Sequence, residues 1–310
     1  MRKGKKALII MLSILGGITV ILYLLFPAVM GIVASTRGAA GKGEPPDGFE
    51  AVTLTAQDSV QLSAWYAPPQ NGACILLLHG AHSSKEEAAG YARMLQKHGY
   101  GVLALDVRGH GGSGGGNALG WECGKDISAA LDYLKSQGST EPVGALGLSM
   151  GGEILLGESS AFPEITAIIS DGATHHSIGD YLSLPENRSL WRSWTTRVMY
   201  FTAGVFTGQQ PPQTTIQDSM TEAADTRYLL IAAGEEADEQ AFGALYADAA
   251  AGRTDLWTVP DAGHTQALSL VPEEYEQRIT EFFDAALLVF DDSFISMVIF
   301  QMESELRKQL

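Results

Sequence analysis

One serine has the surroundings of a catalytic nucleophile. Ser149 ends the apolar run VGALGLS at 143–149, precedes a stretch of helical character, and has Gly147 and Gly151 two positions away on either side. A residue in such a strand-to-helix turn adopts a strained backbone, and neighbours two positions away come too close for a Cβ. The first amides of the following helix supply positive potential where negative charge would develop. The pattern indicates a nucleophile elbow, although glycines also occur near serines in ordinary turns.

A serine hydroxyl needs a base, and His264 is the best placed of the seven histidines. It lies in VPDAGHTQAL, a polar loop after the last apolar run of the chain. We therefore expect it at the same sheet edge as Ser149. His98 looks like a residue at a helix end, and His175 and His176 lack the spacing of a zinc site.

An orienting carboxylate should leave the preceding strand at that edge. The segment LLIAAGEEADEQ offers four candidates at the start of a helix, which are Glu235, Glu236, Asp238 and Glu239. Asp238 is the prediction, because a short carboxylate just before the helix can reach the far imidazole nitrogen. Glu235 and Glu236 compete with it, and Asp171, at the end of an earlier strand, is a more distant alternative.

The segment LLLHGAHSS at 76–84 predicts the other half of the site. The loop after His79 can direct the amide of Ala81 beside that of Met150, which gives an oxyanion hole. His79 itself is expected to brace this loop.

These residues need a sheet to position them. FEAVTLTA and VQLSAWYA alternate in polarity and predict an antiparallel hairpin. Continuous apolar runs follow, and they predict buried parallel strands at 73–79, 101–106, 143–149, 165–171, 227–234 and 254–260. The amphipathic stretches between them predict helices covering both faces of the sheet, at 84–97, 121–136, 150–160, 239–251 and 272–288.

One interval, 172–226, is too long for a single helix and is rich in aromatic residues. We interpret it as an inserted helical cap, whose aromatics either bind an apolar acyl or aryl group or simply pack the insert. The fold class is therefore α/β, with a mostly parallel doubly wound sheet and an inserted cap, over residues 49–288.

The sequence GHGGSG at 109–114 matches the dinucleotide-binding fingerprint G-x-G-x-x-G. More glycines follow and no helix begins there, so a cofactor role is not favoured. We expect a turn fixed by Asp106 and Arg108, and no metal or cofactor is required.

The amino-terminal segment has no charged side chain between Lys6 and Arg37. An apolar stretch of this length can span a bilayer, with the span placed near 7–26. We divide the region into a basic cytoplasmic stub at 1–6, a transmembrane anchor at 7–34 and a linker at 35–48. Four basic residues before the span and two after it predict a cytoplasmic amino terminus. A cleaved signal peptide is the alternative, but its apolar region is usually about 7–15 residues long.

Charge narrows the choice of partners. Residues 1–43 contain six basic and no acidic side chains, which leaves 14 basic and 36 acidic side chains in the remainder. Such a surface repels nucleic acid.

Cys74 and Cys123 are predicted at opposite ends of the sheet, so we expect no disulfide between them. The stretch 289–310 is interpreted as a helical tail.

The motifs LLLHG, LDVRGHGGSGG, GLSMGGE and VPDAGHT, in this order, resemble the α/β-hydrolase superfamily. Within it they resemble bacterial membrane-anchored enzymes akin to the dienelactone-hydrolase and serine-aminopeptidase-like groups. The resemblance implies Ser149 as nucleophile, His264 as base, and the amides of Ala81 and Met150 as oxyanion donors. The sequence departs from the family at the acid, because Ala237 occupies the position where an aspartate is most common.

The expected function is a membrane-anchored serine hydrolase of the carboxylesterase type that cleaves ester bonds through an acyl-enzyme. Its partners would be a small ester or acyl substrate and, through the amino-terminal helix, the cell membrane, with the catalytic domain extracytoplasmic. A serine peptidase, an acyltransferase and a non-catalytic binding protein remain alternatives.

Overall fold

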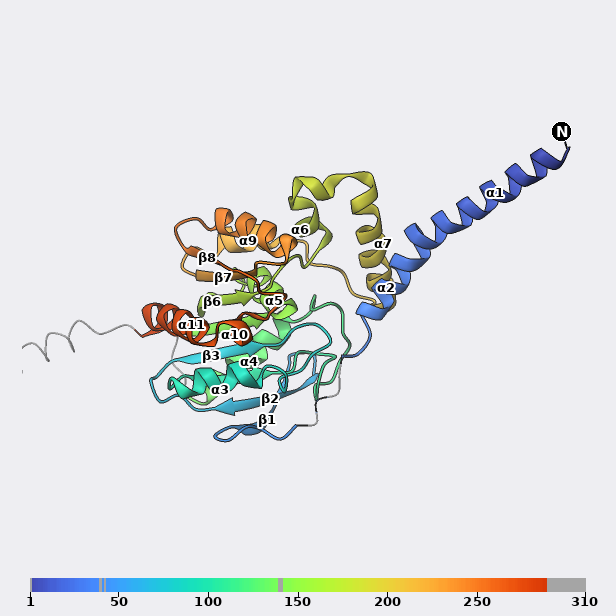
Figure 1. Cartoon of the computed structure of the whole chain (residues 1–310). Helices are drawn as coiled ribbons and strands as arrows, with labels where there is room; N and C mark the ends of the chain where they lie inside the picture. The colour runs from blue at the N-terminus through green and yellow to red at the C-terminus, as the bar shows by residue number, and fades with distance from the viewer. Residues whose placement is uncertain (1, 39–40, 42, 139–141, 289–310) are drawn as a thin grey trace, which may run out of the picture.

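The computed structural model of the chain describes residues 2–38, 41, 43–138 and 142–288. Figure 1 shows a layered domain with a long helix extending from it at the amino terminus. The strands of the domain are β1 (Glu50–Thr55), β2 (Gln61–Ala67), β3 (Cys74–Leu78), β4 (Gly101–Leu105), β5 (Val143–Leu148), β6 (Ile165–Asp171), β7 (Arg227–Ala233) and β8 (Thr254–Val259).

The strands form an eight-stranded sheet in the order β1-β2-β4-β3-β5-β6-β7-β8. β1 and β2 are the antiparallel hairpin that the alternating sequence predicts, and β2 pairs antiparallel with β4. From β4 to β8 every pairing is parallel. All strands fall within the sequence ranges expected for them, so the predicted fold class is confirmed.

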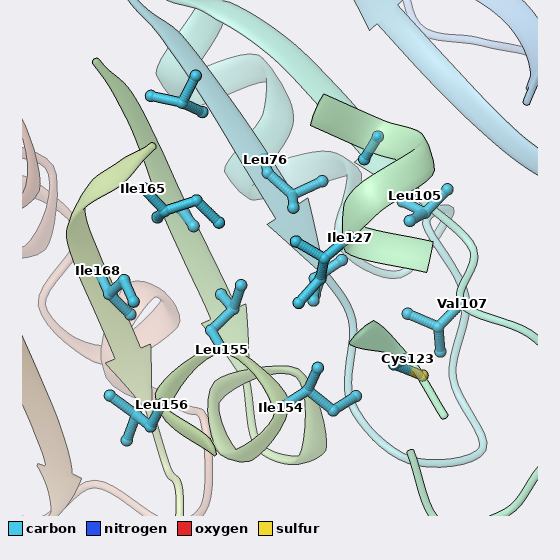
Figure 2. Packing of buried hydrophobic residues seen from close by; sticks show 14 of the residues in the cluster. Leu76, Leu105, Val107, Cys123, Ile127, Ile154, Leu155, Leu156, Ile165 and Ile168 are labelled. Carbon is cyan, nitrogen blue, oxygen red and sulfur yellow. The ribbon is translucent and has the colours of Figure 1, made fainter. Parts of the chain in front are cut away.

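Helices cover both faces of the sheet, as the apolar runs require. The helices that follow the sheet strands are α3 (Ala89–Lys97), α4 (Gly124–Ser136), α5 (Met150–Gly157), α9 (Ala237–Ala249), α10 (Ala267–Leu270) and α11 (Pro272–Leu287). α4, α5 and α9 bury their apolar side chains with one face of the sheet, and α3 and α11 with the other. Figure 2 shows the first of these layers, where Ile127, Ile154 and Leu155 pack near Leu76 and Ile168.

An insertion separates β6 from β7. It contains α6 (Ile178–Ser183), the short 3₁₀ helix η2 (Pro185–Arg188), α7 (Leu190–Thr207) and α8 (Ile216–Glu222). These elements correspond to the cap expected at 172–226. α7 stands beside the end of the amino-terminal helix (Figure 1).

The amino-terminal helix comprises α1 (Arg2–Val20), a π-helical turn η1 (Ile21–Leu25) and α2 (Phe26–Ala34). Its segment Gly4–Ala34 is long and apolar enough to cross a membrane. Its mean hydropathy reaches 2.7 over an 18-residue window, none of which is buried by the described residues. By length and composition it could serve as a membrane span or as a signal sequence. The tail predicted at 289–310 lies outside the described residues.

Two local expectations differ from the structure. α3 begins at Ala89 instead of residue 84, because Lys85 is held by Asp106, which accepts bonds from its backbone nitrogen (2.7 Å) and from Nζ (2.6 Å). The linker is not free where it leaves the helix. Arg37 donates to the carbonyl of Ser113 (2.6 Å), and Asn117 donates to those of Ala34 and Thr36 (2.9 Å each).

The two cysteines are both buried and are not joined by a disulfide. Cys74 begins β3, and Cys123 immediately precedes α4. Burial raises the pKa of the Cys123 thiol well above its ordinary value, which makes this thiol a poor nucleophile.

Candidate active site

Ser149 occupies the turn between β5 and α5 in a strained backbone conformation, with φ 51° and ψ −118°. Its amide donates to the carbonyl of Asp171 (2.7 Å), which ties the turn to the end of β6. Such strain persists only where the surrounding structure enforces it, and it occurs preferentially at functional sites. The elbow geometry expected from the sequence is present.

The glycines around the elbow are required by close backbone packing. A Cβ on Gly147 would lie 2.4 Å from the backbone of Gly151, and one on Gly151 would lie 2.6 Å from the carbonyl oxygen of Leu78. These distances leave no room for any side chain. The pattern G-x-S-x-G therefore has a steric cause in this chain.

His264 lies in the loop after β8 and meets Ser149 across the carboxyl edge of the sheet. Its Nε2 is 2.8 Å from the Ser149 Oγ. Gly172, at φ 82°, makes room for the ring, since a Cβ there would lie 3.0 Å from the His264 Cε1. Residues 115 positions apart are thus brought within hydrogen-bond distance.

The carboxylate beside the imidazole belongs to Glu239, and the expectation that Asp238 would take this place differs from the structure. Glu239 Oε1 lies 2.5 Å from His264 Nδ1, and its Oε2 accepts a bond from the amide of Ala233 (2.8 Å). The Glu239 side chain is 3% exposed, whereas Asp238 is exposed to solvent. Both oxygens of Glu239 are therefore engaged.

The helical phase of α9 explains this difference. The helix begins at Ala237, and its buried face is made by Glu239, Phe242, Gly243 and Tyr246. This i, i+3, i+4, i+7 spacing places residue 239 toward the sheet and residue 238 toward solvent. A glutamate is long enough to reach the imidazole from within the first turn. The aromatic residues Phe242 and Tyr246 were the sequence signal that could have identified Glu239.

Within the described part of the chain, none of the other acidic candidates forms a hydrogen bond with His264. Glu235 and Glu236 are exposed. Asp171 is buried behind the site, where it accepts a bond from the Tyr275 hydroxyl (3.0 Å). Burial is the main reason that the pKa of Asp171 is raised to about 7.

Hydrogen bonding defines the proton positions on His264. With Glu239 as the acceptor beside Nδ1, the proton lies on Nδ1 and Nε2 can accept from the Ser149 hydroxyl. The bond to Glu239 is also the largest cause raising the pKa of His264 above its ordinary value. The arrangement can withdraw a proton from Ser149 and stabilise the resulting imidazolium.

The residues expected to form an oxyanion hole lie beside Ser149. Met150 is the first residue of α5, so its amide has no acceptor within the helix. Gly80, which precedes Ala81, is close enough that a Cβ on it would lie 3.4 Å from the Ser149 Cβ.

His79 braces this loop by means of two hydrogen bonds. Its Nδ1 lies 2.7 Å from the carbonyl oxygen of Gly80, and its Nε2 accepts from the amide of Val107 (3.2 Å). Burial lowers the pKa of His79, which keeps the ring neutral and suits it to this structural position.

Ser149 and His264 open onto a cavity of about 430 Å³. The other lining residues come from the loop after β3, from α3, from the end of β5 and from the loop after β8, and they are Gly80, Ala81, Ser83, Glu87, Tyr91, Leu148 and Thr265. None of the α7 residues lines this cavity. The aromatic residues of the insert therefore do not form its wall.

The glycine loop at 109–117 is a braced turn. Asp106 accepts from the amide of Gly112 (2.8 Å), and a Cβ on Gly111 would overlap the Asp106 carboxylate. Arg108 pairs with Asp126 at 2.7 Å. Helix α4 begins only at Gly124, so no helix amino terminus is available to hold a pyrophosphate after β4. Within the described residues, no group of three or more His, Cys, Asp or Glu side chains could hold a metal ion.

The fold and the elbow together define an α/β hydrolase. The chain belongs to the family described as serine aminopeptidase, S33, whose model matches residues 69–224. That match includes the strand and loop ending in Gly80 and the elbow at Ser149. No curated protein matches the sequence significantly.

Solved structures share the fold. An esterase of Pyrococcus furiosus aligns with a TM-score of 0.63 at 23% identity, over 82% of this chain and 98% of its own. The α/β hydrolase GrgF of a Penicillium species aligns with a TM-score of 0.60 at 15% identity, over 77% of this chain and 99% of its own. A membrane phospholipase A, described as a bacterial virulence factor, aligns with a TM-score of 0.56 at 16% identity, over 92% of this chain and 99% of its own.

Proposed function

We propose that the protein is a membrane-anchored serine hydrolase that cleaves ester bonds with a Ser149–His264–Glu239 triad. The observation that carries the proposal is the continuous chain of hydrogen bonds, 2.8 Å from Ser149 Oγ to His264 Nε2 and 2.5 Å from His264 Nδ1 to Glu239 Oε1. Nucleophile, base and orienting acid in this arrangement are the requirement for acyl transfer to serine.

The reaction follows from this geometry. His264 Nε2 accepts the Ser149 proton as Oγ attacks the ester carbonyl. The amides of Ala81 and Met150 bind the oxyanion, and Glu239 stabilises the imidazolium. His264 then returns the proton to the leaving alcohol, and an acyl-enzyme remains on Ser149. Water, deprotonated by His264, releases the acid and regenerates the serine.

The amino-terminal helix supports the membrane part of the proposal. Its length, its hydropathy of 2.7 and the exposure of its most apolar 18-residue window suit a bilayer span, with the basic stub in the cytoplasm and the catalytic domain on the opposite side of the cell membrane. The membrane phospholipase among the structural neighbours makes lipid esters a reasonable substrate class to test.

Labelling with a fluorophosphonate probe tests the nucleophile. The wild-type chain should be labelled covalently, and Ser149→Ala should lose the label while retaining its thermal transition. Ser83→Ala is the matched control, because Ser83 lines the same cavity and should leave labelling intact. Labelling that persists in Ser149→Ala would place the nucleophile elsewhere.

A peptidase that recognises a free amino terminus is a second candidate, favoured by Glu87. This exposed carboxylate lines the cavity and accepts a bond from the Ser83 hydroxyl (2.8 Å), so it could bind a substrate ammonium group.

For the peptidase, Glu87→Gln should raise the KM for aminoacyl p-nitroanilides about tenfold, the loss of about 1.4 kcal/mol for a charged contact. The same variant should leave the hydrolysis of p-nitrophenyl acetate unchanged. Equal effects on both substrates, or a wild type inert toward the anilides, would leave the esterase as the function.

A further inference from the structure

The amino-terminal half of α7 exposes large apolar side chains to solvent. Leu190 is 72% exposed, Trp191 65% and Trp194 44%. The three side chains lie within about one turn of α7, and they do not line the active-site cavity. An exposed apolar cluster of this kind marks an interaction surface.

This cluster is joined to the apolar amino-terminal helix. The Trp194 indole donates to the carbonyl of Tyr23 (2.8 Å), and the rings of Tyr23 and Trp191 lie 5.3 Å apart. Gly31 permits close packing farther along, since a Cβ on it would lie 2.2 Å from the Met199 carbonyl oxygen. The position of the apolar helix therefore fixes the position of α7.

The depth of the contact follows from helix length. A bilayer core takes about 20 helical residues, so a span that begins near Ala7 ends near Phe26. Tyr23 then lies within a turn of the outer boundary, and Trp191 and Trp194 lie at the same level. Tyrosine and tryptophan are enriched at this depth because their rings suit the boundary between lipid and water.

The basic side chains of this segment also favour contact with a membrane surface. The chain has a net charge of −16, yet the stretch from 185 to 207 contains three arginines and a single acid. Arg188, Arg192 and Arg197 are all exposed on η2 and α7. Guanidinium groups beside an apolar cluster suit the phosphate layer of a membrane surface.

We propose that Leu190, Trp191 and Trp194 form an interfacial patch that inserts the cap into the outer headgroup region of the bilayer. The patch gives the domain a second attachment beside the span and holds the carboxyl edge of the sheet on the membrane side of the molecule. The inference rests on the proposed function in one respect, which is that the amino-terminal helix remains in place as an anchor.

Tryptophan quenching by brominated lipids tests the patch in the full-length chain. The protein is reconstituted in nanodiscs whose phospholipids carry bromine near the headgroup end of one acyl chain. Of the five tryptophans, Trp65, Trp121 and Trp257 are buried in the domain. The quenched part of the emission should therefore come from Trp191 and Trp194, and the double variant Trp191→Phe, Trp194→Phe should lose at least half of it.

Trp257→Phe is the matched control, because Trp257 is buried against Tyr275 of α11 and its replacement should leave quenching unchanged. Emission that is insensitive to brominated lipid, or quenching that survives the double variant, overturns the proposal. Insensitivity to lipid combined with cross-linking between copies through residue 191 would assign the patch to self-association and overturn it equally.

The same nanodiscs separate this proposal from the function proposed above. Intact mass reports whether the amino-terminal helix is retained, and fluorophosphonate labelling reports the serine nucleophile. A retained helix with normal labelling but no quenching rejects the patch alone. A cleaved helix rejects the anchor and the patch together, whereas loss of labelling with normal quenching rejects only the hydrolase.

Discussion

Of the carboxylates whose charge acts on the His264 imidazole, Glu239 and Asp171 have the largest effects, and their environments separate their roles. Glu239 has one oxygen on His264 Nδ1 and the other on the Ala233 amide, so its charge is compensated. Among the described residues, the Asp171 carboxyl accepts a hydrogen bond from the Tyr275 hydroxyl, and burial raises its pKa to about 7. Glu239 is therefore the carboxylate placed to hold the imidazole and to stabilise the imidazolium. The charge of Asp171 has a smaller effect on the pKa of His264 than that of Glu239.

Glu239→Gln should slow ester hydrolysis by about 10³–10⁴-fold, as expected when the orienting acid is removed. His264 must be neutral to act as base, so activity rises with pH through its pKa. The Glu239 charge raises that pKa, and its removal should move the acidic limb of the kcat/KM profile to lower pH. The measurement is a pH–rate profile with p-nitrophenyl acetate.

Asp171→Asn provides the comparison, because Asp171 raises the His264 pKa only as a smaller Coulombic contribution. This variant should shift the acidic limb less and retain most of the activity. If Asp171→Asn proved as damaging as Glu239→Gln, Asp171 would be the functional acid and the assignment made above would be wrong.

At the scale of elements, the sequence predicted strands better than helix phase. Continuous apolar runs such as CILLL and GVLAL predict buried strands of a covered sheet, and they form β3 and β4. Residues 238 and 239 differ by about 100° around α9, and local spacing of carboxylates does not reveal which of them faces inward. The aromatic residues Phe242 and Tyr246, which share the buried face of α9 with Glu239, mark that phase.

The start of α3 and the course of the linker escaped prediction for a related reason. Lys85 reads as a surface helix residue, yet it is buried against Asp106, 21 positions away. Arg37 reads as part of a flexible tether, yet it binds the carbonyl of Ser113. Such long-range contacts leave no local periodicity in the sequence, so the contacts of Lys85 and Arg37 could not be predicted from it. The positions of Ser149 and His264 relative to the sheet could be predicted, because each lies at or just after the end of an apolar run.

The whole molecule is organised around the junction between the apolar helix and the domain. α2 packs on α7, while Ala34 and Thr36 are held by Asn117 beside the braced glycine loop. Figure 1 shows the cap and the amino-terminal helix on the same side of the domain. These contacts hold the end of the helix and the start of the linker against the domain.

Gly31→Leu should disrupt this junction, because its side chain would collide with the Met199 carbonyl and the Thr202 hydroxyl, both within 2.4 Å of the added Cβ. Overpacking of this kind costs about 1–3 kcal/mol. Amide exchange in α7, measured by mass spectrometry on the full chain in nanodiscs, should accelerate about tenfold or more. Hydrolysis of a soluble ester should be unaffected, since Ser149 and His264 lie outside the junction.

Gly16→Leu makes the same change where nothing lies within 4 Å of the added Cβ, and it should leave α7 protected. Equal protection of α7 in both variants would mean that the helix and the cap do not pack together in the membrane.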